Sequence, residues 1–220
     1  MTQELQLRSG AQMRLHGPAD GPAVVCVNGG QPGLVEGTWS ASLEWLVGRL
    51  APRFPQLRLG EVKYRIKSWN AFESCQEDAR AAIAHFDAER TLLLGFSMGG
   101  AIAISVADDP RVEGVLGLAP WIPDRLSLEP LRGRRLDILH GSLDRWLPGV
   151  PGVSPASSRQ GFERAQAMGV PGTYTLIPGA LHAIALRAGS PVPLPRAGTW
   201  ARLVAARLDA FASAAPARGA

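Results

Sequence analysis

From residue 23 onwards, short apolar runs alternate with longer amphipathic stretches, and this alternation restricts the fold more than any other feature. Uninterrupted apolar runs such as Ala23–Val27 are typical of strands that are buried on both faces of a sheet. Strands are predicted at Ala23–Val27, Leu57–Tyr64, Thr91–Phe96, Val112–Ala119, Asp137–His140 and Thr173–Ile177. Helices are predicted between them at Trp39–Leu50, Phe72–Ala88, Met98–Ala107, Arg159–Met168 and Gly198–Phe211. Strands alternating with helices predict a mostly parallel sheet that carries helices on both faces.

The two ends of the chain depart from this alternation. Glu4–Arg8 and Gln12–His16 alternate in polarity and are separated by Gly10, which predicts an antiparallel hairpin at the N-terminal edge of the sheet. Ala212–Ala220 is of low complexity and is expected to fray. A length of 220 residues suits one domain over 1–220, with a core at about 22–212.

Composition excludes several classes of protein. Hydrophobic residues make up 46% of the chain, which is too many for an intrinsically disordered protein. No apolar run is long enough for a transmembrane helix, and the first thirty residues lack the pattern of a signal peptide, so a cytoplasmic protein without a membrane partner is expected. Cys26 and Cys75 lack partners at ligand spacing, so we expect reduced thiols, no metal site and no cofactor.

The net charge of +4 does not indicate a nucleic-acid partner. All the basic residues except Lys63 and Lys67 are arginines, and they are scattered along the chain. The densest cluster, Arg132 with Arg134 and Arg135, is too small to follow a phosphate backbone.

One pentapeptide indicates a nucleophile. Gly95-Phe96-Ser97-Met98-Gly99 has the form G-x-S-x-G, follows a predicted strand and opens a predicted helix. That strand–turn–helix context is the one a nucleophile elbow needs, because the serine sits in a sharp turn that leaves no room for side chains at the flanking glycines. Ser97 is therefore the candidate nucleophile.

A serine hydroxyl needs a base, and the base needs a group to orient it. Of the four histidines, His182 follows the last predicted strand and precedes the last helix, where the order Ser, acid, His places the base. Asp144 lies just past the carboxyl end of the Asp137–His140 strand and is the candidate acid. Asp137 begins that strand and therefore lies at its wrong end.

An oxyanion hole needs two backbone N–H groups. Met98, directly after the nucleophile and at a helix N-terminus, is one expected donor. The second is expected from the glycine-rich loop after Ala23–Val27, with Gly30 as first choice and Gln31 as second.

These residues together resemble the α/β-hydrolase family over about residues 22–212. The resemblance rests on the GFSMG elbow, on the HGSLD run that carries Asp144, and on His182 after the last strand. Members of this family often have His-Gly at the start of the oxyanion loop, where this chain has Asn28-Gly29. Family members often insert a cap domain after the sixth strand, whereas only Pro120–Gly133 separates the corresponding strands here. The resemblance therefore implies an α/β-hydrolase fold without a cap domain.

The implied chemistry is acyl transfer from a small-molecule substrate, an ester or thioester of a small or medium acyl group, to the serine and then to water. Four apolar residues on or near loops after strands are candidates for the acyl pocket: Trp69, Trp121, Ile122 and Trp146. A cyclase, lyase or other non-hydrolytic enzyme on the same scaffold remains an alternative, as does a binding protein with a vestigial site. The sequence does not indicate an oligomeric state.

Overall fold

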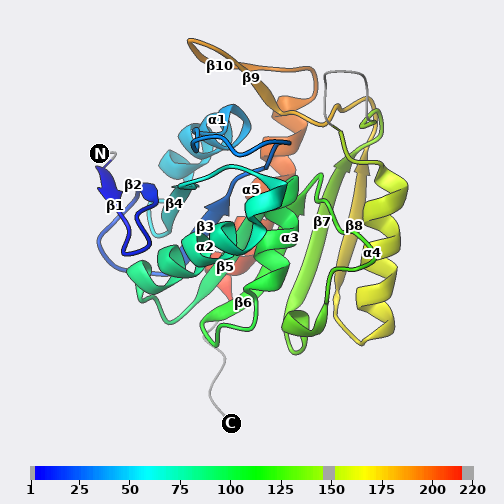
Figure 1. The fold of residues 1–220 in the computed structure, drawn as a ribbon, viewed down its shortest axis with the longest axis horizontal. Helices are drawn as coiled ribbons and strands as arrows, with labels where there is room; N and C mark the ends of the chain where they lie inside the picture. The colour runs from blue at the N-terminus through cyan, green and yellow to red at the C-terminus, as the bar shows by residue number, and fades with distance from the viewer. Residues whose placement is uncertain (1–2, 146–151, 215–220) are drawn as a thin grey trace.

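The computed structural model describes residues 3–145 and 152–214, and its centre is a sheet of eight strands with helices on both faces (Figure 1). The strands of this sheet are β1 (Gln3–Gln6), β2 (Gln12–His16), β3 (Ala23–Val27), β4 (Arg58–Lys63), β5 (Thr91–Phe96), β6 (Val112–Leu118), β7 (Arg135–Gly141) and β8 (Gly172–Ile177). The helices are α1 (Ala41–Leu50), α2 (Phe72–Phe86), α3 (Met98–Ser105), α4 (Pro155–Ala167) and α5 (Ala197–Ser213).

The strand order is β1-β2-β4-β3-β5-β6-β7-β8. β3 to β8 run parallel to one another, while β2 pairs antiparallel with both β1 and β4. The predicted fold class, a mostly parallel sheet with an antiparallel N-terminal hairpin, is confirmed. The parallel strands bring all their carboxyl ends to one edge of the sheet, which is the edge where Ser97 follows β5.

Two apolar layers sandwich the sheet, and β3 shows how its strands supply both. Val25 and Val27 belong to the layer covered by α2, α3 and α4, and Val24 and Cys26 to the layer covered by α1 and α5. Successive side chains of a strand point to opposite faces, so a strand between two helical layers must be apolar at every position. This is the physical reason for the uninterrupted apolar runs.

Several boundaries differ from the expected ones, most of them by one or two residues. β7 begins at Arg135 and ends at Gly141, one or more residues beyond the prediction at each end. α4 begins at Pro155 rather than at residue 159, because the Ser154 side chain accepts a hydrogen bond from the N–H of Ala156 and caps the helix. α5 continues to Ser213, beyond the predicted end of the core.

One element was not predicted at all. A second, two-stranded sheet pairs β9 (Ala185–Ala188) with β10 (Ser190–Pro193) in an arm that extends from the main body above α1 (Figure 1). The arm is short and carries two prolines in β10, so its sequence lacks the regular alternation that signals a strand.

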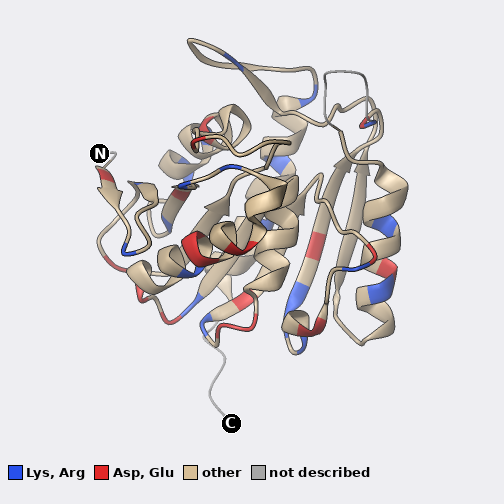
Figure 2. Cartoon of the chain, in the orientation of Figure 1, with Lys and Arg blue, Asp and Glu red and all other residues tan. Residues whose placement is uncertain are grey.

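Charged residues are dispersed over the molecule. Figure 2 shows Lys and Arg on several helices and strand ends, with Asp and Glu between them. Over residues 3–145 and 152–214, no helix combines the length and apolar character needed to cross a membrane.

Candidate active site

Ser97 lies in a strained turn between β5 and α3. Its φ of 56° and ψ of −121° fall in a backbone region that a residue other than glycine rarely adopts. The turn is held by hydrogen bonds from the N–H of Ser97 to the Leu118 carbonyl at 3.0 Å and from the N–H of Trp121 to the Ser97 carbonyl at 2.9 Å. The tip of β6 therefore keeps the strained residue in place.

The two flanking glycines permit the close packing of this turn. A Cβ atom at Gly95 would lie 2.3 Å from the Gly99 carbonyl oxygen, and one at Gly99 would lie 2.2 Å from the Val27 carbonyl oxygen. Both distances are too short for any side chain. The glycine pattern read from the sequence thus reflects backbone contact between the elbow and β3.

His182 and Asp144 form a hydrogen-bonded pair at the carboxyl edge of the sheet. The Nδ1 atom of His182 lies 2.7 Å from Oδ2 of Asp144, whose side chain is fully buried. An ionised carboxylate only accepts hydrogen bonds, so Nδ1 carries the proton and Nε2 is left as the acceptor. That tautomer is the one a general base requires.

Asp144 has two further donors that the sequence did not predict. The N–H of Val153 donates to its Oδ1 at 2.9 Å, and Nε2 of a second histidine, His140, donates to its Oδ2 at 2.9 Å. Burial acts to raise the pKa of Asp144, but the hydrogen bonds from His140 and His182 outweigh it and hold this pKa below its ordinary value. The carboxyl is therefore ionised near neutral pH.

His140 connects Asp144 to a buried polar chain. Its Nε2 also faces the Val153 carbonyl at 2.9 Å, and its Nδ1 lies 2.7 Å from Oγ of Ser158, which in turn lies 2.9 Å from the Tyr174 hydroxyl. The HGSLD run carried a signal for this contact, since it brings a histidine to the end of the strand just before the acid. The contact itself depends on Val153 and Ser158, which are remote in sequence.

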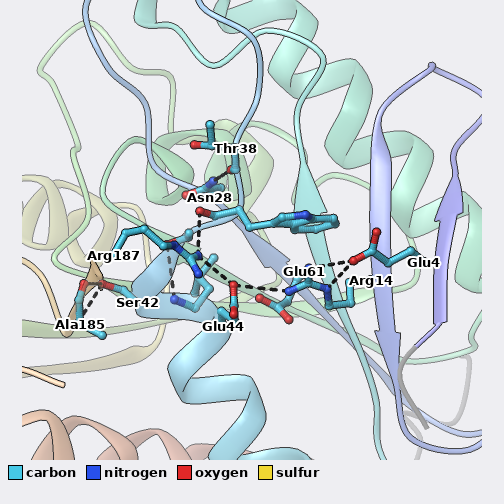
Figure 3. Close-up of polar contacts among 12 residues, drawn as sticks. Glu4, Arg14, Asn28, Thr38, Ser42, Glu44, Glu61, Ala185 and Arg187 are labelled. Atoms are coloured by element: carbon cyan, nitrogen blue, oxygen red, sulfur yellow. Dashed lines mark hydrogen bonds and ion pairs between the residues drawn. The ribbon is translucent and has the colours of Figure 1, made fainter. Parts of the chain in front are cut away.

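The loop that carries His182 is tied to neighbouring elements at both ends. The N–H of Leu143 donates to the Ala180 carbonyl at 2.9 Å, which links the histidine loop to the Asp144 loop. On the other side, Oγ of Ser42 in α1 accepts from the N–H of Ile184 at 3.0 Å, and it also contacts Ala185, as Figure 3 shows. The imidazole is thereby positioned by the first helix and by the acid loop together.

The loop after β3 is stabilised by Asn28, the residue that stands where the family often has histidine. Its side chain donates to the Thr38 carbonyl at 2.8 Å and accepts from the N–H of Gly29 at 2.7 Å. The Tyr64 hydroxyl donates to the Asn28 carbonyl at 2.8 Å. Because Gly29 is already engaged, the N–H of Gly30 is the first one on this loop that is available for an oxyanion.

A pocket of about 540 Å³ opens in front of these groups. Ser97, Met98, Gly30 and His182 all line it, whereas Gln31 does not. Two of the candidate acyl-pocket residues also line it: Trp69 and Trp121, whose rings stack with centroids 6.5 Å apart. The volume is in the ordinary range for a small-molecule site.

The other two candidates are not in this lining. Ile122 is only 1% exposed and packs in the core, where a Cβ atom on Gly161 of α4 would lie 2.5 Å from its side chain. Its side chain belongs to the apolar layer covered by α2, α3 and α4 and not to the pocket lining. Trp146 lies outside the described residues. The unpredicted arm contributes Ala185, Leu186 and Arg187 instead.

Comparison of the sequence with family models and with curated proteins gives no match. Solved structures do match over almost the whole chain. TT1662 from Thermus thermophilus has a TM-score of 0.70 at 18% identity and covers 98% of this chain and 99% of its own. A sugar hydrolase, YeeB, from Lactococcus lactis has a TM-score of 0.70 at 16% identity, with 96% and 98% covered. A monoacylglycerol lipase from Paleococcus ferrophilus has a TM-score of 0.64 at 15% identity, with 91% and 99% covered.

The chain has the α/β-hydrolase fold. Within this fold it is a compact version, because the segment between β6 and β7 holds only the short 3-10 helix Glu129–Leu131 and no cap domain. The β9–β10 arm follows the histidine loop and reaches the pocket. The α/β-hydrolase fold predicted from the sequence is confirmed.

Proposed function

We propose that this protein is a serine hydrolase that cleaves an ester or thioester of a small to medium acyl group. The observation that carries this proposal is the Asp144–His182 pair, which fixes the basic nitrogen of His182 in the pocket that Ser97 lines. The fold alone does not decide chemistry, so the proposal depends on this arrangement of side chains.

In the proposed mechanism Ser97 Oγ attacks the substrate carbonyl while His182 Nε2 takes the hydroxyl proton. Asp144 stabilises the imidazolium and keeps its own charge, which its buried hydrogen bonds favour. The N–H groups of Met98 and Gly30 donate to the oxyanion, and the N-terminal end of α3 adds a favourable dipole. His182 then protonates the leaving group, and a water that it activates releases the acid.

The lining of the pocket supports a substrate with an apolar body. Trp69, Trp121, Phe96 and Met98 line it, and none of the described residues in the lining is an Asp or a Glu. The β9–β10 arm contributes Ala185, Leu186 and Arg187 to the lining, and the pocket volume of about 540 Å³ favours small and medium substrates.

Covalent labelling tests the nucleophile. A fluorophosphonate probe should label the wild-type protein, and Ser97→Ala should abolish the label while leaving the fold intact by circular dichroism. A series of p-nitrophenyl esters of increasing acyl length should then give turnover that depends on Ser97. Normal labelling of Ser97→Ala would show that this nucleophile assignment is wrong.

The same assay separates the alternatives. Labelling without turnover of any ester or thioester would favour a non-hydrolytic acyl transferase, cyclase or lyase that uses the same serine. Absence of both labelling and turnover would favour a binding protein.

A further inference from the structure

A lysine lines the pocket without an acidic partner. Lys67 follows β4 and is half-buried, and its backbone N–H donates to the Val35 carbonyl at 2.9 Å, which fixes the segment against the loop before α1. Its Nζ atom donates to Oγ1 of Thr38 at 3.3 Å. Lys67 and Thr38 both line the pocket that holds Ser97 and His182.

No carboxylate side chain of the protein neutralises this ammonium. Among residues 3–145 and 152–214, Lys67 takes part in no ion pair, and residues 1–2, 146–151 and 215–220 include no Asp or Glu. Glu36 forms a β-bridge with Ile66, the residue before Lys67, but its carboxylate makes no ion pair with Lys67. The charge of Lys67 therefore faces the pocket uncompensated.

Arg187, the other cation in the lining, is different. It donates to the Glu44 carboxylate at 2.8 Å, and Arg14 contacts the same carboxylate at 3.4 Å (Figure 3). The hydrogen bond from Arg187 lowers the pKa of Glu44, so this carboxylate is ionised and compensates the positive charge of Arg187. Of the two cations that line the pocket, Lys67 is the one with unused charge.

The hydrogen-bond inventory at Lys67 also leaves donors unused. An ammonium has three protons, and one is directed to Thr38. Since Thr38 Oγ1 accepts that bond, its own hydroxyl proton remains free to be donated. Over the described residues neither that proton nor the other two ammonium protons has a protein acceptor. A monoanion bound here would accept from two adjacent donors, one of them charged.

Burial lowers the pKa of Lys67, because partial removal from water disfavours its charged form. Burying an ammonium without a counter-ion is unfavourable. Pockets for small molecules generally pair an apolar lining with a few polar groups that set specificity. Lys67 is placed to act as one of these polar groups that set specificity.

We propose that Lys67 and Thr38 form an anion subsite and that the preferred substrate is an ester bearing a free carboxylate remote from the scissile carbonyl. Thr38 is exposed, so the subsite lies near the mouth of the pocket, while Ser97 lies deeper. The apolar body of the substrate would lie between them against Trp69 and Trp39. This inference rests on the proposed hydrolase function for its catalytic part.

Two esters of the same diacid test the subsite. Monomethyl adipate carries one carboxylate, and dimethyl adipate is its neutral counterpart; homologues from succinate to suberate vary the distance between the ester and the charge. The wild-type protein should hydrolyse the best monoester with a kcat/KM about tenfold or more above that of the matching diester, mainly through KM. Lys67→Met should remove that preference.

Arg53→Met is the matched control, because Arg53 is an exposed cation of the short 3-10 helix after α1 and lies outside the pocket lining. It changes the net charge equally and should keep the wild-type ratio of monoester to diester turnover. Loss of the preference in both variants would mean that net charge alone causes it, and retention in Lys67→Met would assign it to another group. Either result overturns the proposal.

A binding measurement separates this proposal from the hydrolase function. Monomethyl adipate should quench the tryptophan fluorescence of Ser97→Ala, and adding Lys67→Met should weaken the Kd about tenfold or more. If p-nitrophenyl esters are hydrolysed but Kd does not depend on Lys67, the subsite is wrong and the hydrolase stands. If no ester is hydrolysed while binding depends on Lys67, the subsite stands and the hydrolase is wrong.

Discussion

Replacement of Asp144 by asparagine tests the central pair at the level of single hydrogen bonds. The carboxylate accepts three N–H donors, from His182 at 2.7 Å and from His140 and Val153 at 2.9 Å each. A carboxamide offers one accepting oxygen and one NH₂ group in the same space. Since the N–H of Val153 cannot rearrange, Asp144→Asn forces a choice between Val153 and the two imidazoles.

Each choice has a predictable cost. If the amide oxygen faces Val153, the NH₂ group faces His182, which must then accept at Nδ1 and carry its proton on Nε2, the nitrogen that should act as base. If the oxygen faces the imidazoles, the NH₂ group meets the Val153 N–H, and a buried donor is left unsatisfied at a cost of about 1–3 kcal/mol. In both cases the negative charge that stabilises the imidazolium is lost.

We expect Asp144→Asn to lower kcat/KM by about 10⁴-fold, the size that the wrong tautomer has in a Ser-His-Asp triad. At about 1.36 kcal/mol per decade this corresponds to roughly 5 kcal/mol of transition-state stabilisation. The measurement is p-nitrophenyl ester turnover together with urea unfolding. Asp137→Asn is the control, because Asp137 is a nearly buried carboxylate of β7, the strand that precedes Asp144, and its partners are Arg135, Thr173 and Arg207. A folded Asp144→Asn protein with activity within tenfold of wild type would refute the reasoning.

Three further predictions follow from the same contacts. Gly99→Ala places a Cβ atom 2.2 Å from the Val27 carbonyl oxygen and should destabilise the fold by about 1–3 kcal/mol in urea, whereas Gly48→Ala, with open space around its Cβ, should not. The pKa of Asp144 in the folded protein lies below its ordinary value. Its contribution to stability is therefore present above the unfolded pKa of about 3.9 and is lost as pH falls through the folded pKa. The difference in free energy of unfolding between wild type and Asp144→Asn should be smaller at pH about 3 than at pH about 7. His140→Gln should lower kcat about 10- to 100-fold with little change in KM, because it loosens the acid without touching substrate, and Ser158→Ala should give a smaller effect in the same direction; an unchanged kcat in a folded His140→Gln protein would contradict this.

Much of the site is local in sequence, and that part could be predicted. The elbow around Ser97 is a strand, a sharp turn and a helix within one short segment, so its glycines and its apolar flanks appear together. The parallel-sheet pattern then implies that the carboxyl ends of β5, β7 and β8 share one edge, which brings Ser97, Asp144 and His182 to the same region. Periodicity of side-chain burial is a local property, and these inferences depend only on it.

The rest depends on contacts between remote segments, which no local pattern encodes. Whether a side chain after a strand faces the pocket or the core depends on its tertiary neighbours, and so Trp121 lines the pocket while its neighbour Ile122 packs against α4. The β9–β10 arm, which supplies Arg187, has short strands and prolines in β10, so its strands could not be recognised from the sequence pattern.

The sequence by itself determined the layered architecture, which follows from burial periodicity, and it indicated candidates for nucleophile, base and acid from the G-x-S-x-G motif and from the order of strands along the chain. Only the tertiary structure decided what surrounds them: the second histidine on Asp144, the asparagine that holds the oxyanion loop, and the pocket lysine that faces no carboxylate. Those features depend on contacts between segments that are distant in the sequence. An uncompensated charge in particular can be recognised only when every neighbour in space is known.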